Sequence, residues 1–139
     1  PTDFSSGAEL ATELAIEMAR KFNAELTLLH TYAIQVYIDP LGETYPLSAE
    51  TVYKIQDTAE RSLELIRKRA SEAGVKAKSQ IVDGVDSEVI LATAKSAGID
   101  LIVMGTHGRT GLKHFLLGSV AEKVVRLASC PVLTVRAPA

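Results

Sequence analysis

Residues 100–120 read DLIVMGTHGRTGLKHFLLGSV, and this stretch decides the fold. It begins with the most apolar short run of the chain, 100–104, which predicts a buried central strand. A glycine-rich segment follows, and a helix is expected over 119–128. A Cys-Pro pair breaks that helix, and the apolar run 132–135 predicts the last strand. Strand, loop, helix and strand in this order are typical of a crossover unit in a parallel sheet.

The same alternation extends upstream through the rest of the chain. Apolar residues at every third or fourth position predict further helices, and short apolar runs predict further strands. We expect helices near 6–23, 48–73 and 86–97, and strands near 25–31 and 76–82. The strand at 76–82 is the most polar, as an edge strand would be. The pattern predicts an α/β fold, an open parallel sheet with helices on both faces.

Local signals refine the ends and faces of these helices. Ser6 and Glu9 have the spacing of a capping box, and Asp86 can cap the third helix. Glu64 and Lys68 are spaced as an ion pair on the wet side of the second helix. The stripe expected to face inward on that helix is Val52, Ile55, Ala59, Leu63, Ile66 and Ala70.

Only four strands can be predicted within these 139 residues. Thr2, Asp3 and Phe4 precede the first helix and resemble the tail of a strand. We therefore expect a fifth strand upstream of Pro1, so that the first strand of the sheet is largely missing from this numbering.

Composition limits the class of protein. The chain has a mass of 14.9 kDa, 47% hydrophobic residues and 23% charged residues, which fits one folded domain over residues 1–139. Fifteen basic and 17 acidic residues give a net charge of −2, so no global field favours nucleic acid or an anionic membrane. A single cysteine excludes an intramolecular disulfide and suits a reducing compartment, so we expect the cytoplasm.

The segment 33–47 differs from the rest, because it contains two prolines, a glycine and two tyrosines. It predicts a long, partly ordered connection that leaves the sheet where ligands bind. Its apolar residues favour a cover over the ligand or an extension of a dimer contact. The alternative is a loop packed on its own helix.

The glycines of the opening stretch follow the pattern Gly105-x2-Gly108-x9-Gly118-Ser119. Glycine lets the backbone approach a ligand closely, and the free amides of a helix that begins at Ser119 favour an anion. The segment therefore indicates a phosphate site at the carboxyl edge of the sheet. The alternative is a connection whose glycines only serve tight turns. Neither the nucleoside-triphosphate loop with its Gly-Lys-Ser/Thr ending nor the dinucleotide fingerprint is present.

Four segments together resemble the universal stress protein family. They are PTDFS at the start, LLHT after the first helix, GTHG and GS after DLIVM, and CPVLTV at the end. The resemblance covers the whole chain except 33–47. It implies a five-stranded sheet in the order 3-2-1-4-5, with the strand upstream of Pro1 in the middle. Within the family, the glycine pattern marks the members that bind ATP.

The resemblance also implies which residues hold the nucleotide. Asp3 matches the aspartate that contacts adenosine. Thr31 matches a position that lines the adenine pocket, where Val is more common. The positions implied at the ribose are Met104 and Gly105, and those at the phosphates are Gly108, Gly118, Ser119 and Val120. His107 and Arg109 lie near the ligand, although solvated loop charges are the alternative for Arg109 and its neighbours.

The cofactor implied is ATP. No group of residues has metal-ligand spacing, so we expect any metal ion to be Mg²⁺ or Mn²⁺ that binds together with the nucleotide. The partner implied is a second copy, since dimers of the family pair their last strands, here 132–135. The expected function is a nucleotide-dependent regulatory or binding module in the stress response. The alternatives are a slow ATPase or phosphotransferase that uses the same pocket, and a phospho-receiver domain. A receiver needs an acidic cluster, whereas Asp3 stands without an acidic neighbour in the sequence.

Overall fold

The computed structural model describes residues 1–33, 37–38, 40–46, 48–108 and 117–137. The helices are α1 (Ser6–Phe22), α2 (Ala49–Glu72), α3 (Asp86–Ser96) and α4 (Ser119–Leu127). The strands are β1 (Leu26–Tyr32), β2 (Tyr37–Ile38), β3 (Thr44–Tyr45), β4 (Ala77–Asp83), β5 (Ile102–Gly105) and β6 (Val132–Val135). The four helices and four long strands expected from the alternation are therefore present, with ends that shift by one or two residues.

The long strands form two parallel pairs. β1 pairs with β4 from Leu26 opposite Ala77 to Tyr32 opposite Asp83. β5 pairs with β6 from Ile102 opposite Val132 to Gly105 opposite Val135. Among the described residues, the hydrogen-bonded sheets are these two pairs and the short pair of β2 with β3. The parallel pairing is as expected, and the order of a five-stranded sheet stays a prediction.

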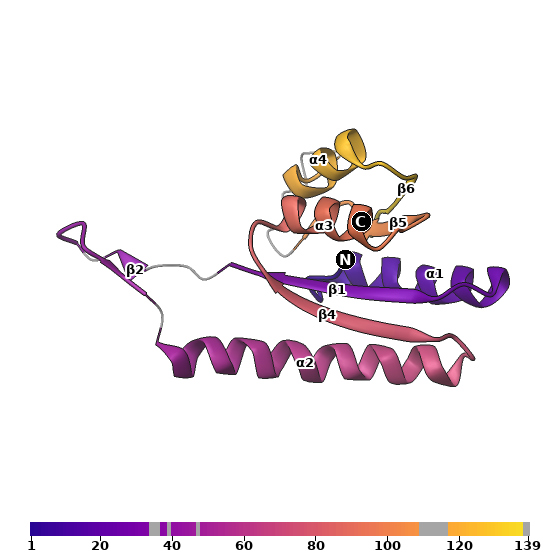
Figure 1. Ribbon diagram of the computed structural model, residues 1–139, viewed down its shortest axis with the longest axis horizontal. Coiled ribbons are helices and arrows are strands. Elements are labelled where there is room, and N and C mark those ends of the chain that lie inside the picture. The colour runs from indigo at the N-terminus through magenta and orange to yellow at the C-terminus, as the bar shows by residue number, and fades with distance from the viewer. Residues whose placement is uncertain (34–36, 39, 47, 109–116, 138–139) are drawn as a thin grey trace.

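Helices cover both sides of these strands (Figure 1). α2 lies along one side of β1 and β4, and α3 and α4 lie together on the other side. α1 packs mainly against β5 and β6 and also contacts β1, so it joins the two strand pairs. One core cluster lies between α3, α4 and β5 and includes Met104 and the fully buried Val124. A second lies between α2 and β1 and contains Leu63, whose exposed fraction is 0%.

The start of α1 differs from the expected capping box. The N-cap is Ser5, whose hydroxyl accepts a hydrogen bond from the Ala8 amide at 3.3 Å. Ser6 is the first helical residue, and the Glu9 carboxylate pairs with Arg69 on α2. The cap moves by one residue because Asp3 already holds the Ser5 amide, at 3.0 Å, and fixes the turn before the helix.

Only the second half of α2 buries its predicted stripe. Ala59, Leu63, Ile66 and Ala70 are buried, but Val52 is half-buried and Ile55 is exposed. The first turns of the helix extend past the strands, so the described residues cover them less than the second half (Figure 1). On the wet side, Glu64 pairs with Arg67 at 3.0 Å rather than with Lys68.

The connection between β1 and α2 contains a short antiparallel hairpin. β2 and β3 pair through Tyr37 with Tyr45 and Ile38 with Thr44. The hairpin extends beyond the first turn of α2 and away from α3 and α4 (Figure 1), and Leu41 at its turn is 88% exposed. The apolar positions Ile34 and Val36 lie outside the described residues. A cover over the ligand therefore stays a prediction.

No helix in the described ranges combines the length and the apolar character needed to cross a membrane.

Candidate functional site

A cavity of about 730 Å³ opens at the carboxyl ends of β1 and β5. Its wall includes every predicted site residue in the described ranges, namely Asp3, Thr31, Met104, Gly105, His107, Gly108, Gly118, Ser119 and Val120. Arg109 lies outside those ranges, as do Lys113 and His114. The volume falls within the range of about 300–1,000 Å³ that is usual for small-molecule sites. Residues far apart in sequence therefore meet at the edge where parallel sheets bind ligands.

Glycines allow three backbone segments to meet at this cavity. A Cβ on Gly105 would lie 2.9 Å from the carbonyl carbon of Gly7, so only glycine lets β5 end against the start of α1. A Cβ on Gly108 would lie 2.7 Å from the Asp3 carboxylate. Side chains at these positions would push the aspartate or α1 away from the loop.

Gly118 is required for a different reason from the one its place in the pattern suggests. The pattern predicts that its missing side chain leaves room for a phosphate. In the structure, a Cβ there would point at the Thr106 carbonyl oxygen, 3.1 Å away, and at His107. The Gly118 amide also donates to that carbonyl, at 2.7 Å. Gly118 thus lets the chain just before α4 lie against Thr106, which brings the start of α4 to the cavity.

The first turn of α4 offers backbone amides to the cavity. Its N-cap is Gly118, and no side chain caps it in the described part of the chain. By contrast, Ser5 and Ser48 cap α1 and α2 with their hydroxyls. Ser119 and Val120, at this first turn, line the cavity. Helix-start amides without a side-chain cap, together with the positive end of the helix dipole, are chemically suited to an anion such as phosphate.

Asp3 is held at the entrance to α1. Its Oδ1 accepts the Ser5 amide at 3.0 Å, and its Oδ2 is the carboxylate atom nearest to Gly108. The Thr2 amide donates to the Leu29 carbonyl at 2.8 Å, which ties this segment to β1. The carboxylate is therefore fixed in the cavity wall, where it can accept hydrogen bonds from ligand hydroxyls.

The two histidines of the cavity differ in their surroundings. His30 is 8% exposed, its Nδ1 donates to the Thr2 carbonyl at 2.8 Å, and its ring lies 4.6 Å from that of Phe4. These contacts fit the structural role expected for it. His107 lies in the glycine loop, with Nδ1 3.0 Å from the Thr106 hydroxyl.

Thr106 and Asp86 are among the cavity residues that were missed from the sequence. Thr106 is 7% exposed and lies between two residues of the glycine pattern. Asp86 is not the N-cap of α3, which is Val85; it is the first helical residue, and its Oδ1 accepts the Thr31 hydroxyl at 2.7 Å. The signal for Asp86 was its place just after β4, because that strand ends at the same edge as β1.

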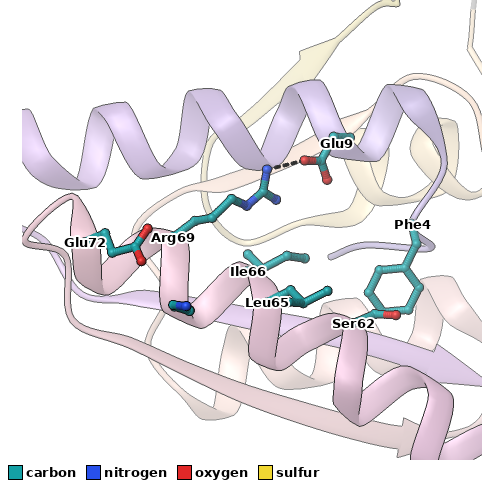
Figure 2. A pocket seen from close by; sticks show the side chains of 8 residues that line it. Phe4, Glu9, Ser62, Leu65, Ile66, Arg69 and Glu72 are labelled. Atoms are coloured by element: carbon teal, nitrogen blue, oxygen red, sulfur yellow. Dashed lines mark hydrogen bonds and ion pairs between the residues drawn. The ribbon is translucent and has the colours of Figure 1, made fainter.

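A second hollow, of about 540 Å³, lies between the start of α1 and the second half of α2 (Figure 2). Phe4, Leu65 and Ile66 contribute apolar surface, and Arg69 donates to Glu9 across it. That hydrogen bond raises the pKa of Arg69 above its ordinary value. Glu9 and Arg69 neutralise each other there, and none of the glycine pattern lines this hollow, so it is not the predicted site.

Cys130 is a partly buried free thiol that packs against the core cluster beneath α3 and α4. This environment fits a small core residue rather than a nucleophile. Within the described ranges, no group of three or more His, Cys, Asp or Glu residues could hold a metal ion.

Parallel strand pairs, helices on both sides and a cavity at the carboxyl edge define an α/β protein whose cavity has the size and place typical of small-molecule sites. The model of the universal stress protein family matches residues 1–136. The chain belongs to that family.

Individual relatives agree with this assignment. Universal stress protein MJ0531 of Methanocaldococcus jannaschii is 37% identical over 139 residues, which cover 99% of this chain and 80% of the relative. A solved structure of the hypothetical protein MJ0577 superposes with a TM-score of 0.82 at 36% identity, covering 100% of this chain and 94% of the other. A universal stress protein solved in complex with cAMP has a TM-score of 0.68 at 26% identity, covering 99% and 93%.

Proposed function

We propose that this protein binds ATP in the cavity at the carboxyl edge and acts as a nucleotide-dependent regulatory or binding module in the stress response. The observation that carries the proposal is the gathering of the predicted residues around one cavity of about 730 Å³. The relative solved with cAMP supports an adenine nucleotide as the ligand.

The chemistry of the wall suggests how the nucleotide lies. The phosphates take the amides at the start of α4, where Ser119 and Val120 line the cavity. Met104 and Gly105 lie along the ribose, and the Asp3 carboxylate accepts from the adenosine part. Thr31, at the end of β1, lies at the base. Mg²⁺ or Mn²⁺ accompanies the phosphates, since both prefer oxygen ligands.

Calorimetric titration with ATP and Mg²⁺ tests the proposal. We expect one site per chain. A ligand at a hundred times its dissociation constant stabilises the native state by about 2.7 kcal/mol, so ATP should also raise the melting temperature by several degrees. Inorganic triphosphate, which lacks the nucleoside, is the control and should stabilise far less. The absence of both heat and thermal shift with ATP would refute the proposal.

The finer architecture is part of the same proposal. The Thr2 amide already bonds to β1 on Leu29, as the continuation of a strand beside β1 would. A middle strand upstream of Pro1, between β1 and β5, would complete the order 3-2-1-4-5, and residues 1–139 would form one domain with it. Slow amide exchange on the sides of β1 and β5 that face each other would support it. A second copy paired through β6, and a cytoplasmic location, complete the proposal.

A slow ATPase or phosphotransferase is the second candidate. The observation that favours it is His107, a titratable side chain that lines the same cavity. The rate of ATP turnover distinguishes it from a binding module.

A further inference from the structure

Thr31 and Asp86 meet at the cavity although they are far apart in the sequence. Thr31 lies near the carboxyl end of β1, and Asp86 begins α3. The Thr31 hydroxyl donates to Asp86 Oδ1 at 2.7 Å, and both residues line the cavity. The bond exists because this chain has a hydroxyl at position 31.

The hydrogen bond determines what the two side chains can still offer a ligand. A threonine hydroxyl has one proton, and here that proton is used on Asp86. The remaining capacity is the lone pairs of Thr31 Oγ1 and of the carboxylate, which has no proton to donate. The Thr31–Asp86 pair therefore accepts hydrogen bonds and donates none.

Charge decides which part of a nucleotide lies next to this pair. The starts of α3 and α4 both lack a side-chain cap among the described residues, but the Asp86 carboxylate at α3 repels phosphate, whereas the α4 amides attract it. A nucleotide with its phosphates at α4 thus turns its base toward Asp86. The exocyclic amine of adenine donates hydrogen bonds, while guanine and hypoxanthine carry a carbonyl oxygen at that position.

We propose that Thr31 and Asp86 determine base specificity, because they accept hydrogen bonds from the exocyclic amine of adenine and disfavour a carbonyl there. This inference rests on the proposed function, since it concerns the same cavity. A carbonyl oxygen that faces the pair meets two acceptor atoms and the negative charge of Asp86, which is the kind of mismatch that hydrogen-bonding sites reject.

The test compares the dissociation constants of ATP and inosine triphosphate, which differ at this position of the base. The wild-type protein should prefer ATP by about tenfold or more. Asp86→Asn offers an amide donor in place of the carboxylate, so it should lower this preference by about tenfold and strengthen binding of inosine triphosphate. Glu88→Gln is the matched control: it removes a charge from the same helical turn, outside the cavity wall, and should leave the preference unchanged.

Thr31→Val provides a second variant if Asp86→Asn fails to fold. It keeps the shape of the side chain, removes one acceptor and should also reduce the preference for ATP. Equal binding of the two nucleotides by the wild type, or an unchanged preference in the variants, would overturn the inference while the proposed function stands. If the wild type binds neither nucleotide, the proposed function fails and this inference fails with it.

Discussion

Asp3 connects the glycine loop to the start of α1. Its Oδ1 holds the Ser5 amide, and Gly108 leaves room for its other oxygen. Gly118 instead meets backbone, the Thr106 carbonyl. A clash with a side-chain end can be relieved by rotation, but a clash with backbone must move the loop. Replacing Gly108 should therefore mainly affect ATP binding, whereas replacing Gly118 should mainly affect the stability of the fold.

Gly108→Ala should weaken ATP binding by about ten- to a hundredfold, the size of one lost charge-assisted hydrogen bond. Its Cβ would displace the Asp3 carboxylate, while stability changes by less than about 1 kcal/mol. Gly118→Val should instead destabilise the fold by about 1–3 kcal/mol through overpacking. Calorimetry and urea unfolding measure the two effects. In an Asp3→Ala background, Gly108→Ala should cost little further affinity, and a full second loss would contradict this coupling.

The residues that sequence reasoning missed depend on contacts between distant segments. The glycine pattern is local, so it predicted the loop and the start of α4. Asp86 was interpreted as a cap because its contact with Thr31 spans 55 positions of sequence. Ser5 and Ser6 are both good caps, and the choice between them depends on the turn at Phe4, whose φ is 62°. A positive φ at one residue does not change the spacing of apolar residues in the helix that follows, so this spacing could not predict the turn.

Among the elements, α2 shows how much the spacing of apolar residues can predict about the burial of a helix. Its apolar stripe is continuous in sequence, but a partner surface exists only for the second half, where Leu63 and Ile66 pack against β1. The stripe predicts which face can be buried, and the length of the neighbouring strands decides how much of it is buried.

Leu63 and Leu65 on α2 provide a matched pair for this argument. Leu63 is 0% exposed, so Leu63→Ala should lower the free energy of unfolding by about 2–5 kcal/mol. Leu65 is 67% exposed, so Leu65→Ala should change it by less than about 1 kcal/mol. Urea unfolding measures both. Similar losses for the two variants would show that α2 packs differently from the structure.

β6 is the element expected to join two copies. The carbonyls of Pro131 and Val135 accept amides from the β5 strand and the loop after it. Because the direction of backbone groups alternates along a strand, the Thr134 amide points to the opposite edge. An unprotected edge of this kind invites a partner strand.

Thr134→Pro should therefore convert a dimer into a monomer, because it removes an outward amide without removing a bond to β5. Light scattering over a range of concentrations measures the mass, and circular dichroism checks the fold. Thr134→Val keeps the amide and should remain dimeric. A wild-type monomer at micromolar concentration, or a dimeric proline variant, would rule out pairing through β6.

At the scale of the whole molecule, the strand pairs meet through α1 and the cavity lies at their common edge. Alternation of strands and helices was enough to predict parallel pairing and helices on both sides, since crossover connections allow little else. The order of all strands could not be derived in this way, because several orders satisfy the same alternation. The resemblance supplied the order 3-2-1-4-5, and the described hydrogen bonds establish β1 with β4 and β5 with β6.

The same whole-molecule arrangement predicts binding without rapid chemistry. Fast phosphoryl transfer requires a positioned base or water-orienting group, cationic charge on the transferred group and a fixed metal. The described wall offers amides and Ser119 for the phosphates, but Asp3 is already bonded to the Ser5 amide and is assigned to adenosine. A site that grips substrate and transition state equally gains affinity rather than rate.

ATP turnover by the purified protein should therefore fall well below the roughly 1–100 s⁻¹ of kinases. A single-turnover assay with Mg²⁺ and excess protein measures the chemical step directly. His107 is the titratable side chain closest to the role of a base, because it lines the cavity within the glycine loop. His107→Ala should leave the slow rate within about threefold and ATP still bound. A rate in the kinase range that His107→Ala abolishes while binding persists would make this protein an enzyme, with the cavity as its active site and His107 as its base.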